Sequence, residues 1–358
     1  MMRLLYILLP LLFLLACNSE VKQQLDSKNP ALGKLNQVVV IADEELWKGA
    51  VGDTFRFYFE SAYPILPAPE SIFDIKFYTP NQLVSGPTRK ELRTYIILAD
   101  LSDAESSTTK MVKKDMGSEK YNSAMNTGKP FTSLGKDKWA KGQFLAYMGG
   151  ANEEVLIQTI KKSYPAIARR INEHDQPKLK AMSFGIKSNK GLSRMVRENY
   201  YLDIDIPVEY TTARRDSLNN VLWLVRRTNE ADMHLVFKKY RYDNPNQVSK
   251  DSIISWRNDF GQNYVTSDIE DNFMIVNEQD LPVYEYVHDI DGSYTKELRG
   301  IWEMTKEFTG GPFATYVVVL EDKKELIYID AFVLAPGHKK RNYMMQLDCI
   351  VKSAKVNS

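Results

Sequence analysis

The sequence is poor in the residues that build covalent frameworks and metal sites. It has only two cysteines among 358 residues, Cys17 and Cys349. No His-x-x-x-His or Cys-x-x-Cys spacing occurs, and the four histidines lie far apart: His174, His234, His288 and His338. These absences argue against a disulfide framework and against a zinc site. We therefore predict no metal and no cofactor, and a body held together by its apolar core.

The chain also lacks an excess of charge of either sign. It has 47 Lys and Arg residues against 46 Asp and Glu residues. Removing residues 1–16 takes away only Arg3 among these, so 47 − 1 leaves 46 basic against 46 acidic residues. Nucleic-acid binding relies on a positive surface that displaces counterions from phosphates. We therefore expect no nucleic-acid partner.

Motifs of the common catalytic classes are missing as well. No Gly-x-Ser-x-Gly, Walker loop or Gly-x-Gly-x-x-Gly occurs, so serine hydrolase, nucleotide and dinucleotide readings lack support. Ser107 and Lys110 fit Ser-x-x-Lys, but the companion Lys-Thr-Gly is absent and the segment is typical of a solvated loop. Asp203 and Asp205 alternate along a strand, which an exposed strand face explains more simply than a glycosidase pair. No catalytic residue can be assigned.

Two other patterns also have a structural explanation that we favour. His288–Gly292 carries Asp at alternate positions, like part of a calcium loop, but a third acid and a closing Glu are missing. A hairpin turn built on Asp291-Gly292 is the simpler interpretation. Cys349 lies in an apolar helical pattern, which predicts a buried, inert thiol rather than a nucleophile.

What the sequence does have is a distinctive N-terminus. Residues 1–16 contain Arg3 near their start and continue as an apolar run from Leu4 that ends in Leu-Leu-Ala directly before Cys17. The run is too short to cross ~30 Å of hydrocarbon, which takes about 20 residues. The pattern is typical of a secretory signal peptide followed by a bacterial lipobox cysteine. We predict that Cys17 is acylated, that residues 17–34 form a flexible tether, and that the acyl chains anchor the protein stably in a membrane.

The rest of the chain alternates strand-like and helical patterns. Apolar β-branched runs predict strands, among them residues 37–42, 94–99, 143–148, 221–227, 313–320 and 326–333. Apolar residues at helical spacing predict several amphipathic helices. We predict an α+β fold of antiparallel sheets with amphipathic helices packed on one face, in two halves at residues 35–176 and 177–358.

Three local expectations accompany this fold. Residues 102–138 show weak periodicity and are predicted to be a mobile excursion with one short helix. A long helix from Asn152 is predicted to kink at Pro165 and to end by Pro177. Thr94–Asp100 resembles Thr315–Glu321; two related β-β-α units would explain this likeness, and chance similarity between apolar strands is the alternative.

Several motifs carry a family resemblance. They are Arg299–Glu303, Gly310–Phe313, Tyr328–Gly337 with Lys340-Arg341, and, earlier in the chain, Leu66–Glu70 with Phe73-Asp74. These stretches are similar to an uncharacterised Bacteroidota lipoprotein family, domain of unknown function DUF4837, over nearly the whole mature chain. The resemblance implies an envelope lipoprotein and brings no catalytic residue. Some lipoproteins of that phylum reach the cell surface through acidic residues after the acylated Cys; here Glu20 stands alone, which favours the periplasmic face of the outer membrane.

A basic cluster lies where the last helix is predicted to begin. Lys339, Lys340 and Arg341 place positive charge at the positive end of the helix dipole. Such an arrangement costs from a few tenths to about 1 kcal/mol and implies a nearby anion. That anion is either an internal carboxylate or an external ligand or partner.

These observations favour a non-enzymatic envelope lipoprotein that binds an envelope protein or a cell-wall partner. The alternative is an envelope hydrolase of glycan or peptide whose catalytic carboxylates the sequence does not identify. A concave pocket with carboxylates of perturbed pKa would favour the hydrolase. A flat, exposed aromatic patch would favour the binding protein.

Overall fold

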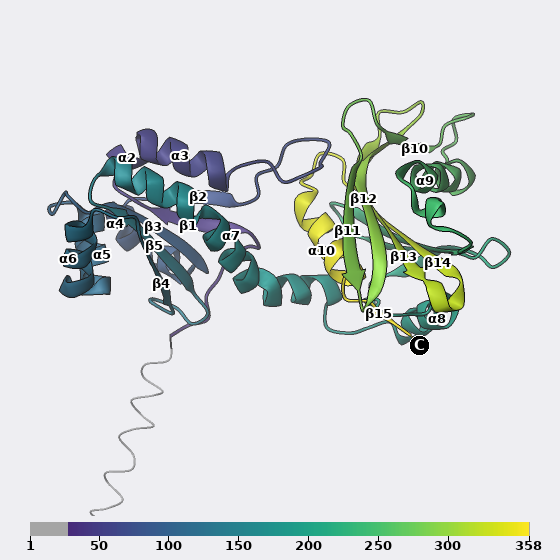
Figure 1. The fold of residues 1–358 in the computed structure, drawn as a ribbon, viewed down its shortest axis with the longest axis horizontal. Helices are drawn as coiled ribbons and strands as arrows, with labels where there is room; N and C mark the ends of the chain where they lie inside the picture. Colours follow the sequence, from purple (N-terminus) through teal and green to yellow (C-terminus); the bar gives the residue numbers. More distant parts are fainter. Residues whose placement is uncertain (1–27, 358) are drawn as a thin grey trace, which may run out of the picture. The chain divides into compact units, whose positions relative to one another are not determined.

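The computed structural model describes residues 28–357. The predicted signal peptide, Cys17 and most of the predicted tether lie outside the described residues. Within the described range, no helix combines the length and apolar character needed to cross a membrane. The chain separates into two compact units (Figure 1). The first contains the residues up to Ser61 and Phe73–His174, and the second contains Ala62–Ile72 and the residues from Asp175 onward.

The first unit is built on a five-stranded sheet with the order β2-β1-β3-β5-β4. Its strands are β1 (Gln37–Ile41), β2 (Asp74–Tyr78), β3 (Thr94–Asp100), β4 (Phe131–Lys136) and β5 (Phe144–Gly150). The first three and β5 are parallel, and only β4 is antiparallel to its neighbour. The predicted antiparallel arrangement is therefore wrong for this sheet, because helical crossovers connect its strands.

Helices cover both faces of this sheet, rather than the predicted one. They are α2 (Glu44–Lys48), α3 (Ala50–Phe59), α4 (Pro80–Ser85), α5 (Ser107–Met116), α6 (Ser118–Thr127) and the first part of α7 (Glu153–Phe184). One face packs against α4, α5 and α6. On the other face, the rings of Phe59 in α3 and Tyr164 in α7 meet edge to face at 5.0 Å. Both faces need cover because β5 is buried at every position.

Segment 102–138 is folded and is not the predicted mobile excursion. It contains α5, α6 and β4. Val112, Tyr121 and Ala124 anchor the two helices in the core, and the Tyr121 hydroxyl donates to the Leu101 carbonyl at 2.8 Å. Met111, Met116 and Met125 also pack against this core. Polar and charged residues outnumber the apolar ones in both helices, so their periodicity is too weak to be recognised in the sequence.

The predicted end of α7 is also wrong. The helix runs unbroken for 32 residues and contains both Pro165 and Pro177. A proline removes one backbone donor, and the packed turns on either side outweigh that loss. The division between the two units lies inside this helix, between His174 and Asp175.

The second unit is built on an eight-stranded antiparallel sheet, which confirms the predicted α+β class. The strand order is β10-β12-β13-β14-β9-β8-β7, and β11 pairs with β12 on the same side as β10. The bounds are β7 Thr211–Asp216, β8 Val221–Arg227, β9 Asp232–Arg241, β10 Met274–Asn277, β11 Tyr284–Ile290, β12 Ser293–Met304, β13 Gly310–Leu320 and β14 Glu325–Leu334. A separate two-stranded sheet joins β6 (Leu202–Asp203) to β15 (Lys355–Val356).

Helices again cover both faces of the sheet. The helices α8 (Lys190–Tyr200) and α10 (Arg341–Val351) pack on one face, which we call the α10 face. The helix α9 (Lys250–Tyr264) packs on the opposite face, the α9 face. Almost every position of β13 and β14 is buried, so neither face of these central strands can be left to solvent.

The likeness between β3 and the end of β13 does not reflect a duplication. β3 lies parallel between β1 and β5 and leads to α5, whereas β13 lies antiparallel between β12 and β14 and leads to β14. Both strands are central and buried on two faces. This shared environment explains their shared apolar composition.

The hairpin turn predicted at Asp291-Gly292 is present. Both residues have positive φ, 51° and 84°, and Ile290 pairs with Ser293 across a two-residue loop. The Asp289 carboxylate accepts a hydrogen bond from the Gly292 N–H at 2.8 Å. This carboxylate therefore shapes the turn that joins β11 to β12.

Candidate functional site

The basic start of α10 meets an internal carboxylate. Glu70 accepts hydrogen bonds from the backbone N–H groups of Lys340, at 2.5 Å, and Arg341, at 3.0 Å. Glu70 belongs to Ala62–Ile72, a segment that packs within the second unit. A carboxylate in this position satisfies free helix amides and offsets the positive charge there. Sequence reasoning could not find Glu70, because it precedes Lys340 by 270 residues.

The three basic side chains lie in different environments. Arg341 is 1% exposed, and its guanidinium donates to the backbone carbonyls of Ser71 and Ile72. Lys340 is half-buried and Lys339 is exposed. The Arg341 side chain therefore holds the segment that contains Glu70 against the start of α10. Contact of Lys339 and Lys340 with an external partner stays a prediction.

A second charged cluster lies on the α10 face, between β12 and α10. Glu297 in β12 is 1% exposed, and its carboxylate pairs with Arg299, with His288 Nε2, and with Lys352 Nζ at 3.2 Å. Asp348 in α10 lies 2.7 Å from Arg299 Nη2. Arg299 therefore bridges two carboxylates, and each carboxylate has a cationic partner.

Two tyrosines complete this cluster. The Tyr316 hydroxyl donates to Asp348 Oδ1 at 2.7 Å and accepts from Arg299 Nη2 at 3.1 Å. Burial and the nearby Asp348 charge raise the pKa of the Tyr316 hydroxyl well above its ordinary value. The same two causes raise the pKa of Tyr63 to about 12. Both phenols therefore stay protonated at neutral pH.

The cluster holds its carboxylate ionised. Burial by itself would raise the pKa of Glu297, but Arg299, Lys352 and His288 outweigh burial and lower that pKa below its ordinary value. A general acid needs a carboxyl that carries a proton near neutral pH, as burial without cations provides. Glu297 therefore lacks the protonation state of a glycosidase acid.

A cleft of about 410 Å³ opens beside this cluster within the second unit. Its lining comes from the end of α7, from α10 and from Tyr63, and includes Gln176, Leu179, Lys180, Phe184, Met345, Asp348, Cys349, Lys352 and Ser353. Asp348 and Lys352 are already paired inside the charged cluster. Cys349 is half-buried at this cleft and not fully buried as predicted. The cleft therefore combines apolar walls with charges that are largely neutralised.

The α9 face contains a fully buried ion pair. Asp330 is 0% exposed, and its carboxylate lies 3.2 Å from Arg257 Nε and accepts a hydrogen bond from the Thr315 hydroxyl at 2.5 Å. The Arg257 guanidinium lies 4.0 Å above the centre of the Phe313 ring. Burial raises the pKa of Asp330, although Arg257 opposes this. Because solvent reaches neither charge, the pair is part of the core and cannot act on a substrate.

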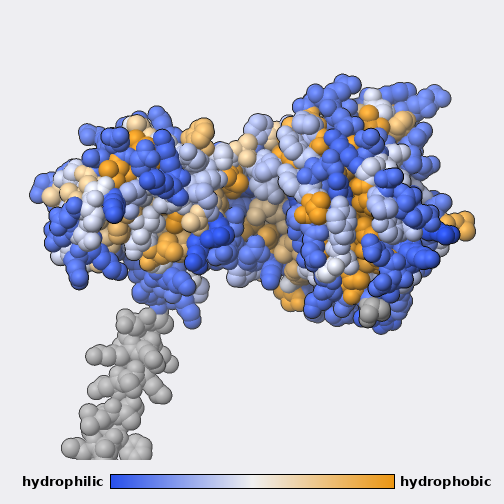
Figure 2. Space-filling view, in the orientation of Figure 1, coloured by the Kyte–Doolittle hydropathy of each residue, from blue (hydrophilic) through white to orange (hydrophobic). Residues whose placement is uncertain are grey.

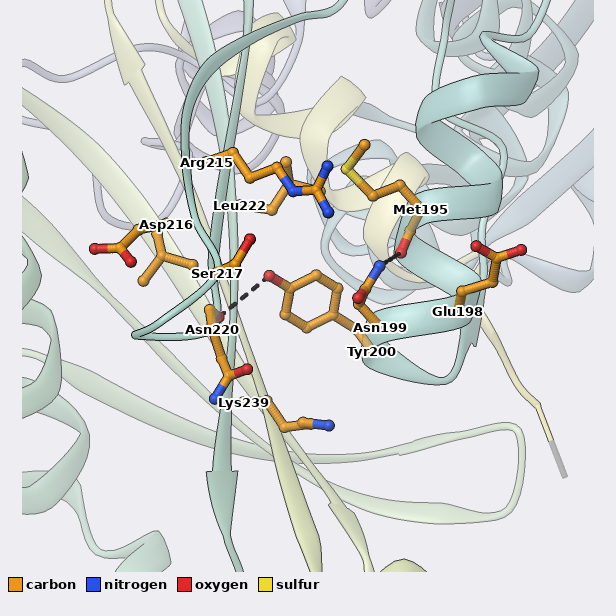
Figure 3. Close-up of a pocket in the computed structure, with 11 residues that line it drawn as sticks. Met195, Glu198, Asn199, Tyr200, Arg215, Asp216, Ser217, Asn220, Leu222 and Lys239 are labelled. Atoms are coloured by element: carbon orange, nitrogen blue, oxygen red, sulfur yellow. Dashed lines mark hydrogen bonds between the residues drawn. The ribbon is translucent and has the colours of Figure 1, made fainter.

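A smaller pocket of about 140 Å³ lies between α8 and the β7–β9 strands (Figure 3). Arg215 and Lys239 line it from the strand side, and Glu198 lines it from α8. The Tyr200 ring stands between them, and its hydroxyl donates to the Asn220 carbonyl at 3.2 Å. Mixed charges around so small a volume do not select a ligand class.

The remaining sequence patterns do not assemble a catalytic site. Ser107 lies in the first turn of α5, so this segment is a helix start and not the predicted loop. Lys110 pairs with Glu105 at 2.7 Å, on the exposed side of that helix. Asp203 and Asp205 are both exposed, as the simpler interpretation predicts.

The β11–β12 hairpin exposes aromatic and apolar side chains that the sequence analysis did not single out. Tyr284 is 43% exposed, Tyr286 39%, Val287 59% and Tyr294 50%, and we call these four residues the hairpin surface. Tyr284 and Tyr286 lie on the α10 face of the sheet, and the other two lie on the α9 face. Elsewhere, the visible surface of the second unit is mainly hydrophilic with separate hydrophobic areas (Figure 2).

Two family models, each of unknown function, match different parts of the chain. Residues 189–353 match a domain of unknown function, DUF4837. Residues 31–183 match a different domain of unknown function, DUF8532. The DUF4837 match is therefore narrower than the predicted resemblance over nearly the whole mature chain, and it contains the Glu297–Arg299–Asp348 cluster and the hairpin surface.

No curated protein matches the sequence. Among solved structures, LpqN of Mycobacterium tuberculosis, described as involved in cell envelope biogenesis, is 12% identical with a TM-score of 0.29, over 44% of this chain and 83% of LpqN. The lipid transfer and protein localization domain of human StarD13 is 10% identical with a TM-score of 0.21, over 46% of this chain and 91% of that domain. Both similarities are too low to support a statement about the DUF4837 fold or function.

Proposed function

We propose that this protein is a lipid-anchored protein of the bacterial cell envelope that binds an envelope protein or a cell-wall partner and does not catalyse a reaction. The anchor is Cys17, and the favoured location is the periplasmic face of the outer membrane. The hairpin surface of the DUF4837 region is the binding surface. Exposed Tyr284 and Tyr286, which share the α10 face of the sheet, are the observation that carries the proposal.

The carboxylates support binding over hydrolysis. Among the described residues, Asp330 is the carboxyl group whose pKa is raised, and it is sealed in the core. Arg299, Lys352 and His288 outweigh burial and lower the pKa of Glu297, and Asp348 beside the cleft is paired with Arg299. A glycan hydrolase needs one protonated and one ionised carboxyl group, both facing the substrate. No such pair lies at the described cleft.

The exposed side chains are of the type that partner-binding surfaces use. Tyrosine combines a rigid apolar ring with a polar hydroxyl, so it contacts sugar rings or peptide groups at a small cost in conformational entropy. Tyr284 pairs with Arg299 and Tyr286 with Glu297 in the strand register, so both tyrosines lie beside the charged cluster that holds β12 to α10. Exposed tyrosines are enriched at the centres of protein–protein interfaces.

The test is capture of the partner from the native envelope. The full-length, lipidated protein is cross-linked and recovered, and the wild type is compared with Tyr284→Ser plus Tyr286→Ser. We expect the double variant to lose the captured partner. Leu218→Ser is the matched control, because Leu218 is an exposed apolar residue, 95% exposed, outside the hairpin surface.

Two results would contradict the proposal. One is equal recovery of partners by the wild type and the tyrosine double variant. The other is turnover of isolated envelope glycan or peptide by the purified protein, which would favour the hydrolase.

A further inference from the structure

We propose that the free edge of β11 binds an extended peptide as an additional strand, and that the preferred peptide carries basic residues flanking an apolar one. This inference rests on the proposed function and names the partner class of the hairpin surface. Three observations support strand addition: the outer side of β11 has no strand partner among the described residues, the other edges of the same sheet are protected, and acidic residues line the β11–β12 hairpin.

The outer side of β11 has no strand partner among the described residues. β11 pairs through all seven of its residues with β12 and with no other strand. In a two-residue hairpin the closing pair, here Ile290 and Ser293, exchanges backbone hydrogen bonds, and such pairs then alternate along the strands. By this alternation the backbone N–H and C=O groups of Glu285, Val287 and Asp289 point away from β12.

The other two edges of the same sheet are protected. β7 contains an irregularity in its register between Thr212 and Arg214, and the side chains of Arg214 and Arg215 are exposed. β10 is only four residues long and packs against α9. Bulges, positive side chains and short length are the usual protections of sheet edges against added strands. β11 has a continuous register over seven residues and contains no lysine, arginine or proline, so Glu285 and Asp289 are the only charges along it and they leave the edge open to a basic partner.

Charge at the hairpin selects the peptide. Glu285, Asp289 and Asp291 carry negative charge along β11 and its turn. Lys296, the single lysine within residues 284–296, pairs with Glu285 and leaves the hairpin with a negative excess. Glu285 and Asp289 flank Val287 on the α9 face. A strand added beside β11 places alternate residues next to these three, so basic, β-branched and basic side chains are favoured there. The residues between them face Tyr286 and His288, where β-branched or aromatic side chains pack best.

A second copy of the chain fits this edge less well. Antiparallel pairing of two β11 strands about Val287 would place Glu285 of each copy opposite Asp289 of the other. Like charges directly opposite each other destabilise a strand pair. The negative hairpin therefore disfavours self-association and favours a basic partner.

The test uses a fluorescently labelled peptide with lysine, valine and lysine at alternate positions, and with threonine and valine between them. Binding to the full-length, lipidated protein in detergent is measured by fluorescence anisotropy. A peptide with glutamate at both lysine positions is the control. We expect saturable binding of the lysine peptide, weaker binding of the glutamate peptide, and slower hydrogen exchange at the amides of Glu285, Val287 and Asp289 in the complex.

Two sets of variants separate strand addition from other contacts. Val287→Pro removes an outward N–H while the hydrogen bonds of β11 to β12 remain, and we expect binding to weaken at least about fivefold, the loss of one hydrogen bond. Val287→Thr keeps the N–H and the branched side chain and should bind as the wild type does. Glu285→Lys plus Asp289→Lys should reverse the preference and favour the glutamate peptide. This charge variant still tests the inference if Val287→Pro disturbs the hairpin.

Three outcomes overturn the inference. The first is no saturable binding of the lysine peptide. The second is binding that is unchanged in both Val287→Pro and the charge-reversal variant. The third is a concentration-dependent dimer that Val287→Pro abolishes, which identifies a second copy as the occupant. If envelope capture still depends on Tyr284 and Tyr286 in any of these cases, the proposed function stands and only strand addition falls.

Discussion

Replacing Arg341 with alanine tests how the start of α10 is held in the second unit. The Arg341 side chain is 1% exposed and donates to the carbonyls of Ser71 and Ile72, the latter at 3.3 Å. Its Nε also donates to Asn342 Oδ1 at 3.1 Å. The alanine variant would leave these acceptors without their cationic donor and would leave a void beneath the segment that contains Glu70.

The expected cost follows from these contacts. Hydrogen bonds to a charged group contribute roughly 1.5–3 kcal/mol each. Removing one partner of a buried charged contact costs up to about 3–5 kcal/mol. Ser71 and Ile72 are half-buried, so water replaces part of the loss. We therefore expect Arg341→Ala to lower the free energy of unfolding by about 3 kcal/mol, below the upper limit for a buried charge.

Lys340→Ala is the matched control on the neighbouring residue. It keeps the backbone N–H that donates to Glu70 and removes a side chain whose Nζ donates only to the His338 carbonyl. Its expected cost is about 0.5 kcal/mol. Glu70→Gln removes the charge at the helix start and should cost about 1 kcal/mol.

The assay is urea unfolding of the three variants, together with hydrogen exchange of the α10 amides to locate the change in the second unit. A destabilisation by Arg341→Ala no larger than that by Lys340→Ala would refute the structural role. Loss of partner capture in Lys339→Ala plus Lys340→Ala, with stability retained, would support the predicted external contact of these lysines.

Three further predictions follow from the anchor and from two titrating groups. Cys17→Ala should block acylation and remove the protein from the membrane fraction, and unchanged fractionation and processing would disprove the lipid anchor. Burial, aided by Arg227, lowers the pKa of His234 to about 3. The stabilising contribution of neutral His234 is therefore present above pH 6.5 and is lost as the pH falls toward 3. His234→Gln keeps an acceptor for the Trp223 N–H and should flatten the acid side of a stability–pH profile. Burial and the Asp348 charge raise the pKa of Tyr63 to about 12. The contribution of protonated Tyr63 to stability is therefore present below pH 10 and is lost as the pH rises toward 12. Tyr63→Phe should remove this alkaline loss of stability and one late phenolate step in an ultraviolet titration.

Local patterns predict the strands of the second unit well, and the physical reason is burial. Val221–Arg227 is observed as β8 within its predicted bounds, and β13 and β14 extend the predicted strands by only a few residues. A central antiparallel strand covered on both faces must be apolar at consecutive positions, so it forms an apolar run that can be recognised in the sequence. Because β3 and β13 are both central strands, their apolar compositions are alike, and this likeness suggested an internal duplication. Their different pairing shows that the two strands are not copies of one unit.

Some segments depend on contacts with residues that are distant in the sequence, and local patterns did not predict their structure. In α5 and α6, the apolar residues that reach the core, such as Val112 and Tyr121, stand among many polar and charged residues. Pro165 and Pro177 favoured a break in α7 that packing on both sides overrides. β11 exposes tyrosine and valine in place of a regular alternation, so its edge position appears only when its pairing with β12 is known.

The sequence by itself determined the α+β class, the Asp291-Gly292 turn, and the need for an anion at the basic start of α10, because each depends on residues within one element or one turn. Only the tertiary structure decided that this anion is Glu70, that Arg299 joins Glu297 to Asp348, and that the outer edge of β11 has no strand partner within residues 28–357. Each of these features joins positions that are distant in the chain or depends on which strand has no neighbour. Neither relation leaves a periodic signal in the amino-acid order.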